Sequence, residues 1–153
     1  MTFEEEKIYK EQLRAKNLKI IEEIAELKKD WNGYGAKPFK KEDIKLFKTI
    51  INILDNQPAI VPTDRNTLLM QYKFKDGGIL AYEVSKNKID RAYYKNGPVP
   101  VIDSELYEFG MIEDKSEEII LFFKERLNRD IYTFLRRDYN YPICHLIWKE
   151  ESK

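Results

Sequence analysis

The stretch Trp31-Asn32-Gly33-Tyr34-Gly35-Ala36-Lys37-Pro38 separates two segments with helical patterns and sets how the chain reverses between them. Gly33 and Gly35 can adopt positive φ angles, and Pro38 fixes φ where the chain leaves the stretch. The length of this connection suits two neighbouring antiparallel helices. The sequence therefore predicts a helical hairpin over residues 1–57, with this stretch as its turn.

The segment before the turn, from Phe3 to Lys29, carries its apolar residues on one helical face. These residues are Leu13, Ile20, Ile21, Ile24 and Leu27. The same face admits a heptad interpretation, in which Asn17 is the buried polar residue that sets the register of a coiled coil. That interpretation predicts a homodimer through this helix. The width of the apolar stripe instead favours packing onto the helix's own domain.

A second helix is expected to begin near Lys40 and to end before Pro58. Apolar residues cover more than half of its circumference, so it should be the most buried helix. They are Ile44, Phe47, Ile50, Ile51, Ile53 and Leu54.

From Leu68 the apolar residues alternate with others, which is the period of a β-strand. Asp76-Gly77-Gly78 interrupts the alternation, and a three-residue loop with a left-handed glycine keeps the apolar residues on one face. That loop predicts the cross-strand pairs Phe74/Leu80, Tyr72/Tyr82 and Met70/Val84. A second reversal at Lys86-Asn87-Lys88 leads into Ile89–Tyr94. Residues 66–94 are thus predicted to form a three-stranded antiparallel meander.

The rest of the chain is expected to add helix and a little strand. Val99–Ile102 is expected as a short edge strand, and Asp103–Gly110 as a helical turn. Ser116 is a suitable N-cap for a long amphipathic helix over residues 116–137, and residues 143–148 have the composition of a final strand. The predicted fold class is α+β, with the N-terminal helical hairpin and the third long helix packed on a small antiparallel β-meander in a single domain, residues 1–153.

Composition limits the functional classes. The chain has 153 residues and a formal net charge of zero, so no overall field attracts nucleic acid or an anionic membrane. Its apolar runs are too short for a membrane span. The acidic start lacks the pattern of a secretory signal, so a cytoplasmic location is expected. With one cysteine and one histidine, the sequence offers no Cys/His zinc cluster, and no metal or cofactor is predicted.

Catalytic patterns are scarce. Cys144 and His145 are adjacent, and on an extended strand they would point to opposite faces, which prevents them from acting on one substrate atom. Among the carboxylates of the meander, only Glu83 and Asp90 are expected to lie close together, and solvated strand faces account for them. No catalytic residue is therefore assigned, and the chain is expected not to be an enzyme.

Two groups of residues are candidates for binding. On the third helix, Arg126, Arg129, Arg136 and Arg137 fall in one sector opposite the apolar stripe, where they could bind phosphates of nucleic acid or a nucleotide. The aromatic residues Trp31, Tyr34, Tyr93 and Tyr94 are candidates for contact with a protein partner, because such side chains are enriched at recognition surfaces. Within this group, Trp31 is expected to cover the core between the first two helices, with Asp30 or Asn32 satisfying a helix end.

The run Asp30–Pro38, with a helix on each side and an alternating meander after Asp76-Gly77-Gly78, resembles a signature of small uncharacterised bacterial and phage proteins. In those proteins Trp-Asp/Asn-Gly-x-Gly-Ala-x-Pro lies near the start and precedes a helix, a proline-containing link and paired strands. The resemblance covers about residues 20–94. It carries no activity, and it implies a mobile-element or defence-related setting.

These observations favour a non-enzymatic binding or inhibitor module that acts on another protein, as phage counter-defence proteins and antitoxins do. The alternative is a nucleic-acid or nucleotide-binding protein that uses the arginine-lined helix face. A hydrolase that uses His145 is a third and weaker interpretation.

Overall fold

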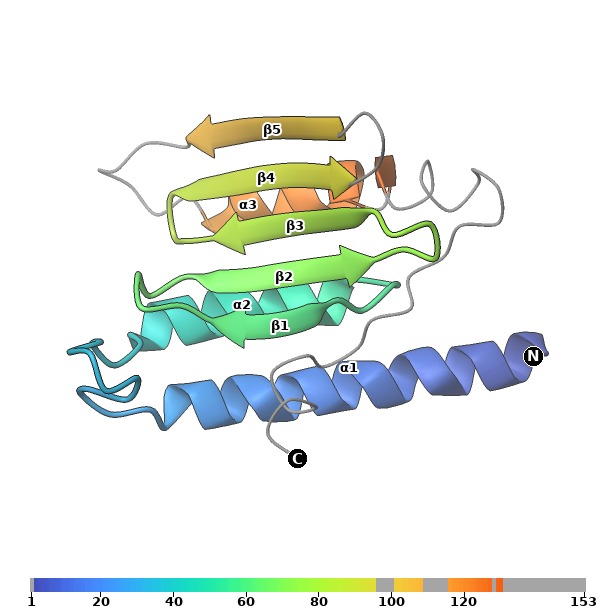
Figure 1. Cartoon of the computed structure of the whole chain (residues 1–153). Coiled ribbons are helices and arrows are strands. Elements are labelled where there is room, and N and C mark those ends of the chain that lie inside the picture. The colour runs from blue at the N-terminus through green and yellow to red at the C-terminus, as the bar shows by residue number, and fades with distance from the viewer. Residues whose placement is uncertain (1, 96–100, 109–115, 128, 131–153) are drawn as a thin grey trace.

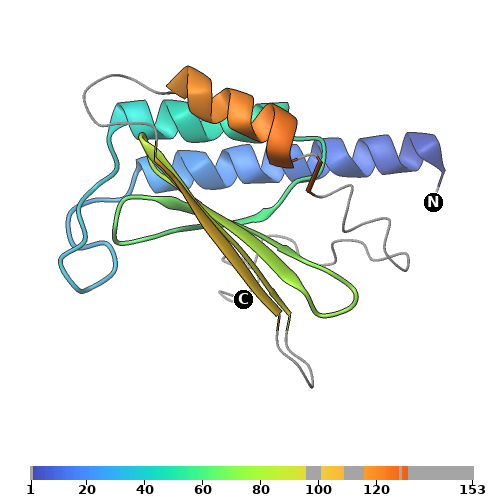
Figure 2. The ribbon, with the colours of Figure 1, turned by 90° about the horizontal axis from the view of Figure 1, so that it is seen from above.

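A computed structural model describes residues 2–95, 101–108, 116–127 and 129–130 of the chain. Its helices α1 (Phe3–Ala25), α2 (Lys41–Ile53) and α3 (Ser116–Phe122) lie on one face of an antiparallel sheet, as the two views in Figures 1 and 2 show. The α+β fold class predicted from the sequence is confirmed. No helix in the described ranges is long and apolar enough to cross a membrane.

The N-terminal helical hairpin is present, and α1 packs against its own domain. Leu13, Ile20 and Ile24 of α1 are buried, and Asn17 is fully buried among them. The amide nitrogen of Asn17 donates to Gln57 Oε1 at 3.0 Å and to the carbonyl oxygen of Pro58 at 2.9 Å. The heptad interpretation of this face was wrong, because the chain's own α2–β1 connection occupies the seam.

Helix α2 is the best-buried helix of the hairpin, as predicted. Phe47, Ile50 and Ile51 have no exposed surface, and Leu54 directly after the helix is equally buried. Their side chains pack against the inward residues of the sheet, which alternate along its three central strands. The core therefore lies between the sheet and the helical layer.

The sheet in the described residues has five strands in the order β1-β2-β3-β4-β5, with every neighbouring pair antiparallel. The predicted meander corresponds to β2 (Leu68–Lys73), β3 (Ile79–Val84) and β4 (Lys88–Lys95). The edge strand β1 (Ala59–Pro62) was not predicted, because it has only four residues and ends in proline. Figure 1 shows it beside β2.

The predicted helical turn over Asp103–Gly110 was wrong for its described part. Strand β5 (Val101–Glu108) instead pairs with β4 along its whole length. This pairing supplies the backbone hydrogen bonds that a helical turn would have formed internally. Of the expected edge strand Val99–Ile102, the described residues 101–102 are the start of this longer strand, and residues 99–100 lie outside the described residues.

The β2–β3 loop has the predicted length, but the predicted register was wrong. Tyr72 lies opposite Leu80, and Met70 lies opposite Tyr82. Each β2 residue thus pairs with a β3 residue two positions earlier than predicted, and the side chains stay on the same face of the sheet. Gly77 takes the left-handed position with φ of 91°, which places the loop at residues 75–77. Gly78 already belongs to the ladder, because Phe74 N–H donates to its carbonyl oxygen.

Gly78 is required by a neighbouring strand rather than by the turn. A Cβ at this position would lie 2.5 Å from the Tyr93 hydroxyl oxygen. We expect Gly78→Ala to lower the free energy of unfolding by about 1–3 kcal/mol, as overpacking does. Urea unfolding followed by circular dichroism measures the loss, and Gly78→Ala with Tyr93→Phe should recover part of it. An unchanged stability in Gly78→Ala would contradict this close contact.

The third helix is interrupted where the sequence predicts a continuous one. α3 ends at Phe122 and passes directly into a π-helical turn at Phe123–Leu127. Of the predicted apolar stripe, Phe123 and Leu127 are buried and Ile120 is partly buried against the core, which confirms for the described residues that the stripe faces the core. The remainder of the predicted helix and the predicted strand 143–148 lie outside the described residues.

Candidate partner-binding surface

The segment Asp30–Pro38, here called the Tyr34 loop, is fixed by its own polar side chains. Asn32 Oδ1 accepts hydrogen bonds from the backbone N–H groups of Tyr34 at 2.8 Å and Ala36 at 3.2 Å. Asp30 Oδ1 accepts from Gly35 N–H at 2.6 Å. Asp30, Gly33 and Gly35 all have positive φ angles, which asparagine, aspartate and glycine tolerate best. The predicted role of Asp30 or Asn32 at a helix end was wrong, since both oxygens bind the loop itself.

Trp31 attaches the Tyr34 loop to the body of the protein. Its ring packs at 6.2 Å from the ring of Phe39, and its Nε1–H donates to the carbonyl oxygen of Lys37 at 3.0 Å. The same carbonyl accepts from Asn66 Nδ2 at 3.1 Å, so the β1–β2 turn also holds the loop. Trp31 packs against the hydrophobic core, which confirms the expected covering role. It is thus better suited to supporting the loop than to contacting a partner.

The other predicted contact residues differ widely in exposure to solvent. Tyr34, at the tip of the loop, is 91% exposed, whereas Tyr93 is only 8% exposed. The assignment of Tyr93 to a contact surface was wrong, because its side chain lies on the inward face of β4 together with those of Ile89 and Arg91. Tyr94 lies on the opposite face of the same strand and is partly exposed. Of the four aromatics, Tyr34 is the one best presented to a partner.

A groove of about 750 Å³ adjoins the Tyr34 loop. It lies where the end of the loop, the start of α2, and the β1–β2 and β3–β4 turns meet. Five cationic side chains line it, and we call it the lysine groove: Lys37, Lys40, Arg65, Lys86 and Lys88. Its carboxylates are Asp43, Glu83 and Asp90. The sequence did not reveal this groove, because its cations come from separate turns.

The charges of the lysine groove are only partly compensated. Arg65 forms an ion pair with Glu83 at 2.6 Å, and the Thr67 hydroxyl donates to the same carboxylate at 2.7 Å. Burial raises the pKa of Asp43, against the opposing influence of the Lys86 charge. The groove's four lysines form no ion pair with any described residue. The groove therefore has an excess of positive charge in a chain whose net charge is zero.

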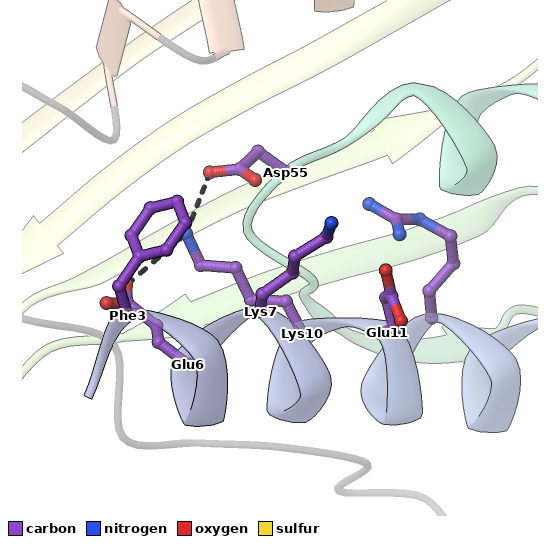
Figure 3. A pocket seen from close by; sticks show the side chains of 7 residues that line it. Phe3, Glu6, Lys7, Lys10, Glu11 and Asp55 are labelled. Atoms are coloured by element: carbon purple, nitrogen blue, oxygen red, sulfur yellow. Dashed lines mark hydrogen bonds and ion pairs between the residues drawn. The ribbon is translucent and has the colours of Figure 1, made fainter. Parts of the chain in front are cut away.

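A smaller pocket of about 330 Å³ lies between the first turns of α1 and the segment after α2 (Figure 3). Lys10 spans it and pairs with Glu6 at 3.4 Å and with Asp55 at 2.9 Å. Arg14 Nη2 donates to the carbonyl oxygen of Leu54 at 2.7 Å. These contacts use the pocket's polar groups to attach α1 to the domain, so it is a weaker candidate than the lysine groove.

The predicted row of arginines is only partly within the described residues. Arg126 Nε lies 3.4 Å from Asp130 Oδ1, and Arg126 Nη2 lies 3.6 Å from Glu105 Oε1. Arg129 is exposed and also has an interaction partner. Arg136 and Arg137 lie outside the described residues, as do Cys144 and His145. Arg126 is thus turned toward β5 and is not a free cation on an outer face.

A buried polar cluster that was not predicted from the sequence joins β3 and β4 to Asp130, which follows the π-helical turn. Asp130 Oδ2 accepts from the Tyr82 hydroxyl at 2.7 Å and from Arg91 Nε at 3.0 Å. Burial and the negative charge of Asp130 raise the pKa of Tyr82. A charged residue at the inward position between Ile89 and Tyr93 was the sequence signal for this cluster. The cluster joins the third helix to the sheet.

No group of three or more potential metal ligands occurs in the ranges that the structure describes. Comparisons with protein-family models, with curated proteins and with solved structures gave no match for this chain.

Proposed function

We propose that the chain is a non-enzymatic binding module that acts on another protein, in the manner of an antitoxin or a phage counter-defence inhibitor. The observation that carries this proposal is Tyr34, which is 91% exposed at the tip of an internally hydrogen-bonded loop. An exposed tyrosine on such a loop supplies contact area at a low entropic cost, since few groups need ordering on binding. The geometry therefore supports Tyr34 as a recognition residue.

The residues that hold the loop in place differ from the residue proposed to contact the partner. Trp31 and Asn66 hold the base of the loop through the carbonyl oxygen of Lys37, and the Tyr34 side chain takes no part in these bonds. A substitution at Tyr34 should thus affect binding without affecting folding, whereas a substitution at Trp31 should affect stability. This difference makes the proposal testable.

Nucleic-acid binding through the third helix has weaker support. Arg126, one of the two arginines of this row that the structure describes, contacts two carboxylates, Glu105 and Asp130, which would compete with phosphate. We therefore place the recognition surface at the Tyr34 loop.

Photo-crosslinking tests the proposal. Tyr34→p-benzoylphenylalanine, made in the cells that produce the chain, should capture one protein species that mass spectrometry identifies. Leu121→p-benzoylphenylalanine is the matched control, because Leu121 is exposed on α3. With the captured protein purified, Tyr34→Ala should weaken its binding by about thirtyfold, the size expected for an aromatic hot spot.

One further variant and one control measurement complete this test. Tyr34→Phe should retain most of the affinity, because it keeps the ring, and Tyr34→Ala should keep the circular dichroism spectrum of the native chain. Equal capture at positions 34 and 121, or an affinity that is insensitive to Tyr34→Ala, would contradict the proposal.

A further inference from the structure

We propose that the lysine groove binds an acidic segment of the partner protein, beside the contact made by Tyr34. This inference rests on the proposed function, because it names the chemistry of the partner's second contact. The groove and the Tyr34 loop are continuous, since Lys37 and Pro38 belong to both. One partner surface can therefore contact the two together.

The groove's cations come from several fixed elements. Lys37 lies next to the last residue of the Tyr34 loop, and Lys40 precedes α2. Lys86 and Lys88 belong to the β3–β4 turn and the start of β4. Ser85 N–H donates to the carbonyl oxygen of Lys88 at 3.0 Å, which closes that turn. The lysine backbones therefore surround the groove at defined positions, and their ammonium groups are available to pair with carboxylates.

The groove's own carboxylates are mostly engaged. Glu83 is held by Arg65 and Thr67, and Asp43 is buried at the first turn of α2. Asp90, the cross-strand partner of Glu83, is the exposed exception. An acidic ligand would thus meet four lysines and one exposed carboxylate.

The lining favours a peptide over a nucleic acid. Among the described residues, no aromatic side chain on which bases could stack lines the groove. Glu83 and Asp90 also line the groove, where they would oppose an unbroken row of phosphates, whereas a peptide can place its carboxylates away from them. Leu106, which is 54% exposed at one side of the groove, offers a contact for an apolar side chain. We therefore assign the groove to an acidic peptide segment with an apolar residue.

A titration of the full chain tests this assignment without knowledge of the partner. The probe is a synthetic peptide of alternating glutamate and serine with a central leucine, and its control replaces each glutamate by glutamine. In ¹⁵N-resolved NMR spectra, the acidic peptide should shift the amide signals of groove residues, and its affinity should fall as salt is raised. The glutamine peptide should cause no comparable shift.

Charge-reversal variants locate the interaction. Lys40→Glu with Lys86→Glu should weaken binding of the acidic peptide by about tenfold at low salt. Lys16→Glu with Lys19→Glu is the matched control, because it makes the same change in net charge at exposed positions of α1. Equal losses in both double variants would overturn the inference, as would shifts outside the groove. A single-stranded oligonucleotide of equal charge that binds more tightly than the peptide would assign the groove to nucleic acid and overturn it too.

The two proposals fail in different ways. If Tyr34 captures a protein partner but the acidic peptide does not bind, the groove assignment is wrong and the binding function stands. If the peptide binds the groove but Tyr34 captures no protein, the proposed function is wrong, while the preference of the groove for carboxylates is supported.

Discussion

Arg91→Leu should lower the free energy of unfolding by about 3–5 kcal/mol, the loss expected when one partner of a buried ion pair is removed. The Arg91 side chain is 4% exposed, and its Nε lies 3.0 Å from Asp130 Oδ2, whose side chain is only 13% exposed. Without Arg91, the carboxylate of Asp130 would remain in a poorly solvated site beside Tyr82. Urea unfolding followed by circular dichroism measures the loss.

Two further variants test whether the expected loss comes from burial of the Arg91–Asp130 ion pair. Arg91→Leu with Asp130→Leu should recover a large part of the stability, because neither charge of the buried pair then remains, and Arg126, which also contacts Asp130, keeps its ion pair with Glu105. Arg65→Leu removes an arginine whose side chain is 66% exposed in its pair with Glu83, so its loss should stay below about 1 kcal/mol. Similar losses for Arg91→Leu and Arg65→Leu would show that burial does not govern the Arg91 pair.

Asn17→Ala should lower the free energy of unfolding by about 2–4 kcal/mol, because it leaves two buried acceptors without their donor. These acceptors are Gln57 Oε1 and the carbonyl oxygen of Pro58. Gln57 in turn donates to the carbonyl oxygens of Ile51 and Leu54 at the end of α2, both at 2.9 Å. Asn17 therefore stabilises the position of Gln57, which satisfies the C-terminal end of α2. Thermal and urea unfolding test the expected loss.

Asn52→Ala is the control for this variant, because Asn52 is exposed on α2 and alanine is a good helix former. Its stability should change by only a few tenths of a kcal/mol. Light scattering adds a second test, since a coiled-coil seam would change its oligomeric state when Asn17 is replaced. If Asn17→Ala changed the molecular mass but not the stability of the folded chain, the intramolecular role of Asn17 would be wrong.

Signals that are local in the sequence were sufficient for much of the fold. The apolar spacing of Ile20, Ile24, Phe47 and Ile51 predicted the two helices of the hairpin and their buried faces. Alternation from Leu68 predicted the central strands, because each inward side chain must reach the same helical layer. Where a residue's structure follows from its immediate neighbours, the sequence alone was informative.

Contacts between distant residues account for what was missed. The register of β2 and β3 depends on which glycine adopts the left-handed conformation, and this is Gly77. Gly78 instead leaves room for the Tyr93 side chain of the neighbouring strand. Strand β1 is too short to show a period, and it is recognisable only through its pairing with β2. The groove lysines come together only once separate turns have been placed at one end of the sheet. These contacts join residues that are far apart in the sequence, so no short stretch of it reveals them.

The Tyr34 loop has a consequence for the evolution of the chain. The oxygens that fix the loop belong to Asp30 and Asn32, and the contacts that anchor it belong to Trp31 and Asn66. Folding of the loop therefore places little constraint on the side chain at position 34. A single codon change there can alter the exposed side chain while the loop and the fold persist, so we expect related chains to differ at position 34 before they differ at Trp31, Asn32 or Asn66.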